Sequence, residues 1–135
     1  MHVEPEFDTE QPNLENVRVL VIDDEPDILD GMRLILEQWQ CEVDTASDYR
    51  QASAVAAATP PDVILCDYRL QDDMTGVEVL HSLEQQHGKP IPAIIITGEH
   101  LAVIENELQQ KNYPLLTKPI NPMQLHASIS RLLAR

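Results

Sequence analysis

The sequence predicts an α/β fold in a single domain: a doubly wound parallel sheet with helices on both faces. Five short apolar runs alternate with five segments whose apolar residues recur at helical spacing. Such alternation is typical of parallel sheets, in which a helix connects successive strands. The runs are almost continuously apolar, as expected of strands that are buried on both faces. A length of 135 residues suits one domain of this kind.

The first two strands and the helix between them are predicted by their apolar residues. Residues 17–22 form a β-branched run that ends at Asp23. The next helix has Pro26 near its first turn, where proline is favoured. Its apolar face consists of Ile28, Met32, Ile35, Leu36 and Trp39. Residues 42–46 form a shorter second strand.

The middle of the chain supplies two helices and the central strand. An alanine-rich helix is expected over 48–58, with Ser47 as its N-cap. The third strand covers 62–66 and ends at Asp67. A loop through Gly76 leads to a third helix, whose inward face is Val77, Leu80 and Leu83.

The last part of the chain repeats the same alternation. A fourth strand covers 91–97, although Pro92 confines its pairing to the later residues. Leu101, Ile104 and Leu108 mark the fourth helix. A short fifth strand over 114–117 precedes a last helix over 122–134, which turns Leu125, Ile129, Leu132 and Leu133 inward.

Charge and composition exclude several classes of protein. Nine Lys and Arg stand against 23 Asp and Glu, a net charge of −14, whereas binding to a nucleic-acid backbone requires clustered basic residues. No apolar run approaches the roughly 20 residues of a membrane span, and no secretion signal is present. The two cysteines form no framework, which favours a reducing compartment. We expect a cytoplasmic domain that itself contacts neither nucleic acid nor membrane.

The first 16 residues differ from the rest. They carry five acidic residues, two prolines and no Lys or Arg. This composition favours a solvated leader or linker, so the folded domain is expected over 17–135.

Five polar side chains stand where the predicted strands end. They are Asp23, Asp24, Asp67, Thr97 and Lys118. The carboxyl ends of parallel strands share one edge of the sheet, so these groups are expected to meet there. Converging carboxylates need a cation to stay ionised together, and an all-oxygen cluster suits Mg²⁺. A metal, an ammonium and a hydroxyl around a carboxylate nucleophile would suit phosphoryl transfer, with Asp67 as the acceptor.

From Val17 onward, the chain resembles a receiver domain, the phospho-acceptor module of bacterial two-component signalling. The matching segments are Val19-Leu-Val-Ile-Asp23-Asp24-Glu25-Pro26, Val63-Ile-Leu-Cys-Asp67-Tyr-Arg-Leu70, Met74-Thr-Gly76, Ile95-Ile-Thr97-Gly98 and Leu116-Thr-Lys118-Pro119. The separations also match, with 43 residues from Asp24 to Asp67, 30 more to Thr97 and 21 more to Lys118. The resemblance implies a flavodoxin-like fold with strand order 2-1-3-4-5.

The resemblance also implies roles for these residues. Asp67 would accept a phosphoryl group from a phosphohistidine on a histidine kinase or a histidine phosphotransfer domain. Asp24 would ligate Mg²⁺ directly, Asp23 mainly through water, and the acceptor carboxylate and the backbone carbonyl of Arg69 would complete the protein ligands.

Other residues would complete the switch. Lys118 and Thr97 would bind phosphoryl oxygens, and the Lys118–Pro119 peptide would be cis, as is usual in the family. Phosphorylation would change loops around Thr97 and the face formed by the fourth helix, fifth strand and fifth helix. The domain would be a monomer or weak dimer.

The chain departs from the family pattern at three positions. Thr75 replaces an aspartate before the structural turn glycine, Gly76, and Gln71 replaces a proline. Leu115 stands where the family generally has a rotating Tyr or Phe, and Tyr113 is offset from that position. The hypothesis is that the aromatic part of the switch is weakened or absent.

Arg69 and Glu99 lie two residues after Asp67 and Thr97, where family side chains tune dephosphorylation. One hypothesis is that they pair across the mouth of the site and restrict the attacking water. The alternative is that both side chains are solvated on loops.

Other interpretations remain open. Haloacid-dehalogenase-like phosphatases also form an aspartyl phosphate, but they place an aspartate where this chain has Arg69. A phosphorylation-independent interaction module is disfavoured by the complete set of site residues. The segment from Asp67 to Leu70 and the acidic leader resemble the C-terminal receiver of a hybrid sensor histidine kinase, so the chain would be the cytoplasmic end of a membrane-bound kinase. A stand-alone or truncated response regulator is the alternative.

Overall fold

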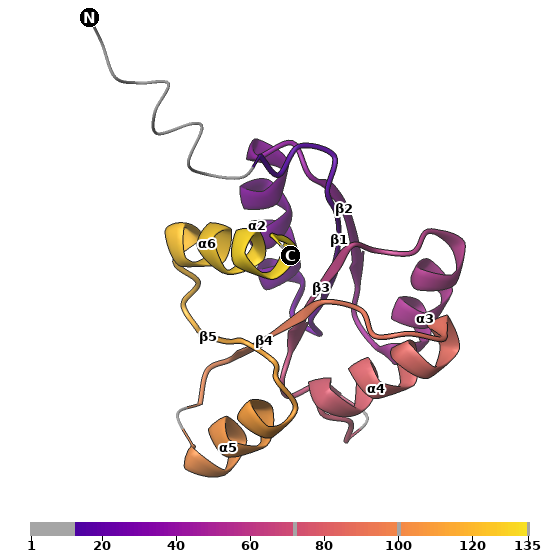
Figure 1. The fold of residues 1–135 in the computed structure, drawn as a ribbon, viewed down its shortest axis with the longest axis vertical. Coiled ribbons are helices and arrows are strands. Elements are labelled where there is room, and N and C mark those ends of the chain that lie inside the picture. The colour runs from indigo at the N-terminus through magenta and orange to yellow at the C-terminus, as the bar shows by residue number, and fades with distance from the viewer. Residues whose placement is uncertain (1–12, 72, 100, 135) are drawn as a thin grey trace, which may run out of the picture.

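Five strands form one parallel sheet in the computed structural model, which describes residues 13–71, 73–99 and 101–134. The strands are β1 (Arg18–Ile22), β2 (Glu42–Ala46), β3 (Val63–Asp67), β4 (Ala93–Thr97) and β5 (Leu115–Thr117). They lie in the order β2-β1-β3-β4-β5, and every neighbouring pair is parallel. The predicted fold class and strand order are confirmed (Figure 1).

Helices cover both faces of this sheet. They are α2 (Pro26–Gln38), α3 (Tyr49–Ala58), α4 (Gly76–His87), α5 (Ala102–Gln110) and α6 (Pro122–Leu133). The helices α2 and α6 lie on one face, and α3, α4 and α5 lie on the other (Figure 1). No helix in the described ranges is both long enough and apolar enough to span a membrane.

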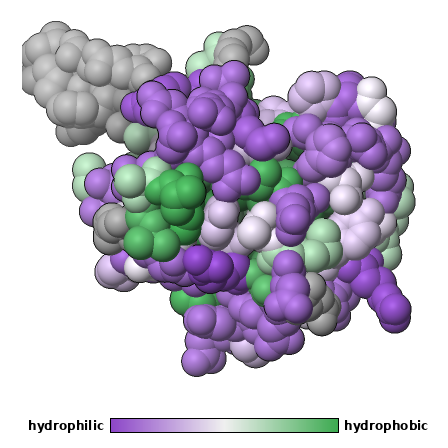
Figure 2. Space-filling model, turned by 90° about the horizontal axis from the view of Figure 1, so that it is seen from below, coloured by the Kyte–Doolittle hydropathy of each residue, from purple (hydrophilic) through white to green (hydrophobic). Residues whose placement is uncertain are grey.

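The core consists of two apolar clusters, one on each face. Along β1, Val19 and Val21 face α2 and α6, whereas Leu20 and Ile22 face the other helices. Every residue of β3 and β4 is buried, as the continuous apolar runs predicted. Viewed from below, most of the surface is hydrophilic, with separate apolar areas (Figure 2).

Several predicted boundaries differ from the structure by one or two residues, and the differences at the starts of α3 and β4 have a clear physical reason. The N-cap of α3 is Asp48, whose carboxylate accepts a hydrogen bond from the backbone N–H of Gln51 at 2.8 Å. The hydroxyl of Ser47 instead donates to the side chain of Gln51. The strand β4 begins at Ala93 rather than at residue 91, because Pro92 has no N–H to donate and contributes only its carbonyl, which accepts from Ile64.

The end of the predicted leader is part of the fold. Leu14 is only 3% exposed and packs in the cluster beneath α2 and α6. Its carbonyl accepts from the thiol of Cys41 at 3.5 Å, and the N–H of Asn16 donates to the carbonyl of Gln40 at 2.8 Å. The expectation of a solvated segment is therefore wrong for Leu14, because an apolar side chain among acidic neighbours still finds a buried position. Residues 1–12 lie outside the described residues.

Candidate functional site

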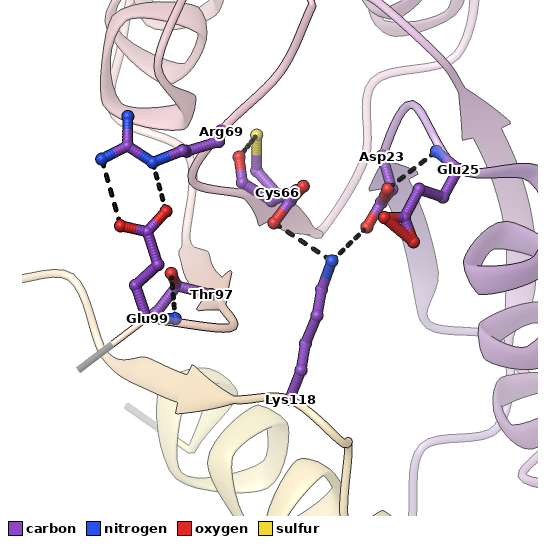
Figure 3. A network of polar contacts seen from close by, with 8 residues as sticks. Asp23, Glu25, Cys66, Arg69, Thr97, Glu99 and Lys118 are labelled. Atoms are coloured by element: carbon purple, nitrogen blue, oxygen red, sulfur yellow. Dashed lines mark hydrogen bonds and ion pairs between the residues drawn. The ribbon is translucent and has the colours of Figure 1, made fainter.

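Lys118 lies between two carboxylates at the carboxyl end of the sheet (Figure 3). Its Nζ atom is 3.3 Å from Oδ2 of Asp23 and 3.4 Å from Oδ1 of Asp67. The strand register explains this meeting. Ile22 pairs with Cys66, so the next residues, Asp23 and Asp67, stand level with each other. The structure therefore brings together three of the residues predicted at the strand ends.

Burial and mutual repulsion shape the charges of this cluster. Asp67 is 8% exposed, and burial first, then the neighbouring Asp23, raise its pKa to about 6 against the pull of Lys118. Burial also raises the pKa of Asp23, although the N–H of Glu25 and Lys118 oppose it. For Lys118, burial lowers the pKa, but the two carboxylates outweigh that effect and raise it overall. The lysine is therefore an ammonium ion at neutral pH.

Three carboxylates gather beside this cluster, at the junction of β1 and α2. Oxygens of Asp23, Asp24 and Glu25 all lie within 4.8 Å of one another. Carboxylate oxygens are hard ligands that suit Mg²⁺, which needs few protein ligands because it retains water. The donor set fits that ion. Glu25 was not singled out from the sequence, although its position directly after two aspartates is visible there. Asp67 is not a member of this close group.

Thr97 ends β4, next to the strand that ends in Asp67. Asp67 pairs with Ile96, so Thr97 stands one residue beyond it. The threonine is 2% exposed, and its Oγ1 accepts a hydrogen bond from the N–H of Glu99 at 3.1 Å. The hydroxyl proton is left to donate to another group.

Arg69 and Glu99 form an ion pair beside the site (Figure 3). The Nη2 atom of Arg69 donates to Oε1 of Glu99 at 3.1 Å, and its Nε contacts the other carboxylate oxygen. The guanidinium also lies 5.7 Å from the centre of the Tyr68 ring. The predicted pairing is present and joins the loop after β3 to the loop after β4. Its effect on dephosphorylation stays a prediction.

Gly76 and Thr75 shape the loop that follows Asp67. A Cβ atom at Gly76 would lie 2.4 Å from the carbonyl oxygen of Asp67, so only glycine fits this close approach. Thr75 is the N-cap of α4 and forms a capping box with Glu78. The threonine at residue 75 thus caps the helix, a role that the aspartate of the family pattern could also fill. The peptide bond before Pro119 is cis.

The two residues discussed for the aromatic switch both lie against the core. Leu115 is half-buried at the start of β5. Tyr113 is also half-buried, and its hydroxyl donates to Glu84 of α4 at 3.5 Å. Burial, then Glu84, raises the pKa of Tyr113 to about 12, so the phenol keeps its proton.

Tyr68 was missed by the sequence analysis. It is 8% exposed, and its hydroxyl donates to Oε1 of Glu107 on α5 at 2.8 Å. Burial and this carboxylate raise the pKa of Tyr68. The two residues are 39 positions apart, and no local pattern connects positions so distant.

Comparisons with known proteins agree with this arrangement. The model of the response regulator receiver domain matches residues 19–130. The chain is 33% identical over 123 residues to the alkaline phosphatase synthesis transcriptional regulatory protein PhoP of Bacillus subtilis. This match covers 89% of this chain and 50% of PhoP. It is 27% identical over 116 residues to the response regulator protein PilR of Pseudomonas aeruginosa, covering 86% of this chain and 26% of PilR.

Solved structures show the same fold. The chemotaxis protein CheY4 of Vibrio cholerae superimposes with a TM-score of 0.79 at 30% identity, over 87% of this chain and 99% of CheY4. The anti-anti-sigma factor PhyR of Bartonella quintana gives a TM-score of 0.77 at 28% identity, over 96% of this chain and 51% of PhyR. The chain spans half or less of the length of PhoP and PilR. Because the family model matches most of the sequence, the chain belongs to the response regulator receiver domain family.

Proposed function

We propose that this receiver domain accepts a phosphoryl group on Asp67 from a phosphohistidine of a partner protein. A carboxylate oxygen of Asp67 attacks phosphorus, the P–N bond to the imidazole breaks, and the leaving imidazole takes up a proton. Later attack by water returns the carboxylate and releases inorganic phosphate. The domain thus promotes its own phosphorylation and dephosphorylation.

The contact of Lys118 with both Asp23 and Asp67 is the observation that carries this proposal. An ammonium already beside the attacking carboxylate is placed to neutralise a phosphoryl oxygen as charge develops there. Mg²⁺, when bound, would supply the remaining positive charge to the phosphoryl oxygens. Asp23, Asp24 and Glu25 would hold it, with the carboxylate of Asp67 and the carbonyl of Arg69 as further ligands.

Thr97 would serve as the phosphoryl-sensing residue of the switch. Its hydroxyl retains a proton to donate to a phosphoryl oxygen. The added charge of about −1.5 to −2 would bias the loop after β4 and the surface formed by α5, β5 and α6. That surface is where we place the output of the domain.

Receiver domains interact with histidine kinases or phosphotransfer proteins, and we propose a partner of this class, docking over the strand ends. PhoP and PilR are regulatory proteins by name. That observation favours a response regulator over a hybrid histidine kinase as the parent molecule. We propose a cytoplasmic location and no direct contact of residues 13–134 with nucleic acid, the latter because of the acidic charge.

The test is incubation of the full chain with acetyl phosphate, with and without Mg²⁺, followed by intact mass measurement. We expect a gain of one phosphoryl group that requires Mg²⁺. The Asp67→Ala variant should gain none. Asp62→Ala is a matched control, because Asp62 lies at the opposite end of β3 and should leave the gain unchanged. If the wild-type chain gains nothing under any condition, an interaction module that works without phosphorylation is favoured instead.

A further inference from the structure

The helix α5 is held to the rest of the domain by few groups. Only Ile104 and Leu108 are buried in it, whereas α4 buries five residues. Its N-cap, Leu101, makes no side-chain capping bond. Val103 is 71% exposed. A helix of nine residues with two buried side chains is easily displaced, because packing supplies most helical stability in proteins.

The hydrogen bond from Tyr68 to Glu107 connects α5 to the residue that directly follows β3. Within residues 13–71, 73–99 and 101–134, it is the only side-chain hydrogen bond between α5 and the rest of the domain. Tyr68 directly follows Asp67, and its side chain belongs to the core cluster shared with Ile104 and Leu108. The hydroxyl therefore reaches α5 from the residue next to the acceptor.

The backbone of Tyr68 is fixed on both sides. Its N–H donates to the carbonyl of Ile96 at 2.8 Å, and its carbonyl accepts from the N–H of Gly76 at 2.7 Å. These bonds fix the backbone at Tyr68, and the packing of its buried ring in the core cluster restrains the side chain. The strand end that carries Asp67 and the packing of the ring together place the hydroxyl against α5.

The start of α5 is connected to the site by a different route. The N–H of Glu99 donates to Oγ1 of Thr97, and the carboxylate of Glu99 pairs with Arg69. If the Thr97 side chain turns toward a phosphoryl group, the bond from the N–H of Glu99 to Oγ1 breaks, while the ion pair of Glu99 with Arg69 remains. Such a change would leave the bond from Tyr68 to Glu107 in place.

We propose that Tyr68 is a positioning residue that holds α5 in its unphosphorylated orientation through the hydrogen bond to Glu107. The inference rests on the proposed phosphorylation of Asp67. It gives the chain a connection between the acceptor and the output surface that does not need an aromatic residue at position 115. Phosphorylation then has to overcome this bond for α5 to move.

The first test removes the hydroxyl group and measures binding of a phosphoryl mimic. Beryllium fluoride with Mg²⁺ is titrated into the full chain and into Tyr68→Phe, and backbone amide signals are followed by NMR. Because the bond stabilises only the unphosphorylated orientation, its loss should tighten binding by about two- to tenfold, the range of one net hydrogen bond. A residue with a merely structural role would leave binding unchanged or weaken it.

The second measurement is amide hydrogen exchange of residues 102–110 without the mimic. Exchange in α5 should be faster in Tyr68→Phe by a similar factor, while β3 and α4 stay protected. Tyr113→Phe is the matched control, since it deletes a hydroxyl bonded to Glu84 of α4. It should change neither α5 exchange nor binding. Glu107→Ala should reproduce Tyr68→Phe, and the double variant should add nothing further.

The outcomes separate the two proposals. If the wild-type chain neither binds beryllium fluoride nor gains a phosphoryl group, the proposed function and the inference both fail. If it does, but Tyr68→Phe binds the mimic with wild-type or weaker affinity, the role of Tyr68 is wrong and the proposed function stands.

Discussion

At the scale of single residues, the site is defined by an imbalance of charge. Asp23 and Asp67 are both nearly buried, yet they share one ammonium, that of Lys118. Burial first, and then the neighbouring Asp23, raise the pKa of Asp67. Asp24 and Glu25 add further negative charge at the exposed side. A divalent cation would neutralise the excess negative charge of the carboxylates. The carboxylate group and Lys118 are therefore best understood together, as one charge-balanced site.

The ion pair between Arg69 and Glu99 leads to a prediction about the lifetime of the phosphoryl group. Arg69→Ala and Glu99→Ala should each shorten that lifetime by about two- to tenfold, because an open loop admits the attacking water and a small change in barrier suffices. The decay of phosphorylated protein, followed by intact mass after removal of acetyl phosphate, measures it. Arg69→Lys keeps the charge but loses the two-point contact, and should give an intermediate lifetime. Unchanged decay in both alanine variants would refute the hypothesis.

The sequence allowed those site residues to be predicted that stand directly at the end of an apolar run. Asp23, Asp67 and Lys118 could be placed together because each follows an apolar strand, and parallel strands end at a common edge. The contact of Tyr68 with Glu107 could not be predicted, because it depends on how a helix packs 39 residues further along the chain. The approach of Gly76 to the Asp67 carbonyl likewise depends on tertiary geometry.

At the scale of elements, the first residue of α4, Gly76, lies directly against the backbone carbonyl of Asp67. Gly76→Ala would place a Cβ 2.4 Å from the carbonyl oxygen of Asp67 and 3.1 Å from Ile95 Cδ1. The backbone must shift, so we expect a loss of about 1–3 kcal/mol in the free energy of unfolding. Urea denaturation followed by circular dichroism measures it. Phosphorylation by acetyl phosphate should also slow, because the carbonyl belongs to the acceptor residue.

Gly31→Ala provides the matched control within a helix. Nothing lies within 4 Å of a Cβ at this position in α2. Alanine has the higher helix propensity, so this variant should be more stable by about 0.5–1 kcal/mol. If both substitutions destabilise the protein equally, the close approach at Gly76 is not what requires glycine there.

Every strand and helix was predicted at this scale, whereas boundaries were less accurate. The alternating apolar segments reveal the strands and helices, because each of these elements must bury an apolar face. Caps depend on competition between neighbouring polar residues, as between Ser47 and Asp48, and sequence alone does not decide that competition. Pro92 shows the opposite case, since the missing N–H was a visible reason for a shorter strand.

At the scale of the whole molecule, the residues before β1 contribute to the core. Leu14→Ala should lower the free energy of unfolding by about 2–5 kcal/mol, because it leaves a cavity beside Cys41. Leu34→Ala removes the same atoms from a side chain that is 65% exposed, and should change stability by no more than about 0.5 kcal/mol. Urea denaturation compares the two. Equal effects would mean that Leu14 is not anchored as described.

The folded domain therefore extends upstream of the run from which it was predicted. Composition assigned residues 13–16 to an acidic leader, because charge and proline content describe a whole segment and do not reveal one buried residue within it. A lone leucine among polar residues carries no periodicity, so its burial depends on how it packs in the apolar cluster beneath α2 and α6.

The assembly of the site from β1, β3, β4 and β5 has a consequence for newly made protein. The proposed acceptor, Asp67, leaves the ribosome 51 residues before Lys118, since 118 − 67 = 51. Until β5 is synthesised and pairs at the edge of the sheet, the acceptor lacks the ammonium that neutralises the incoming group. On the proposed function, a nascent or truncated chain that lacks Lys118 should therefore accept a phosphoryl group poorly, so phosphorylation would await the synthesis of β5.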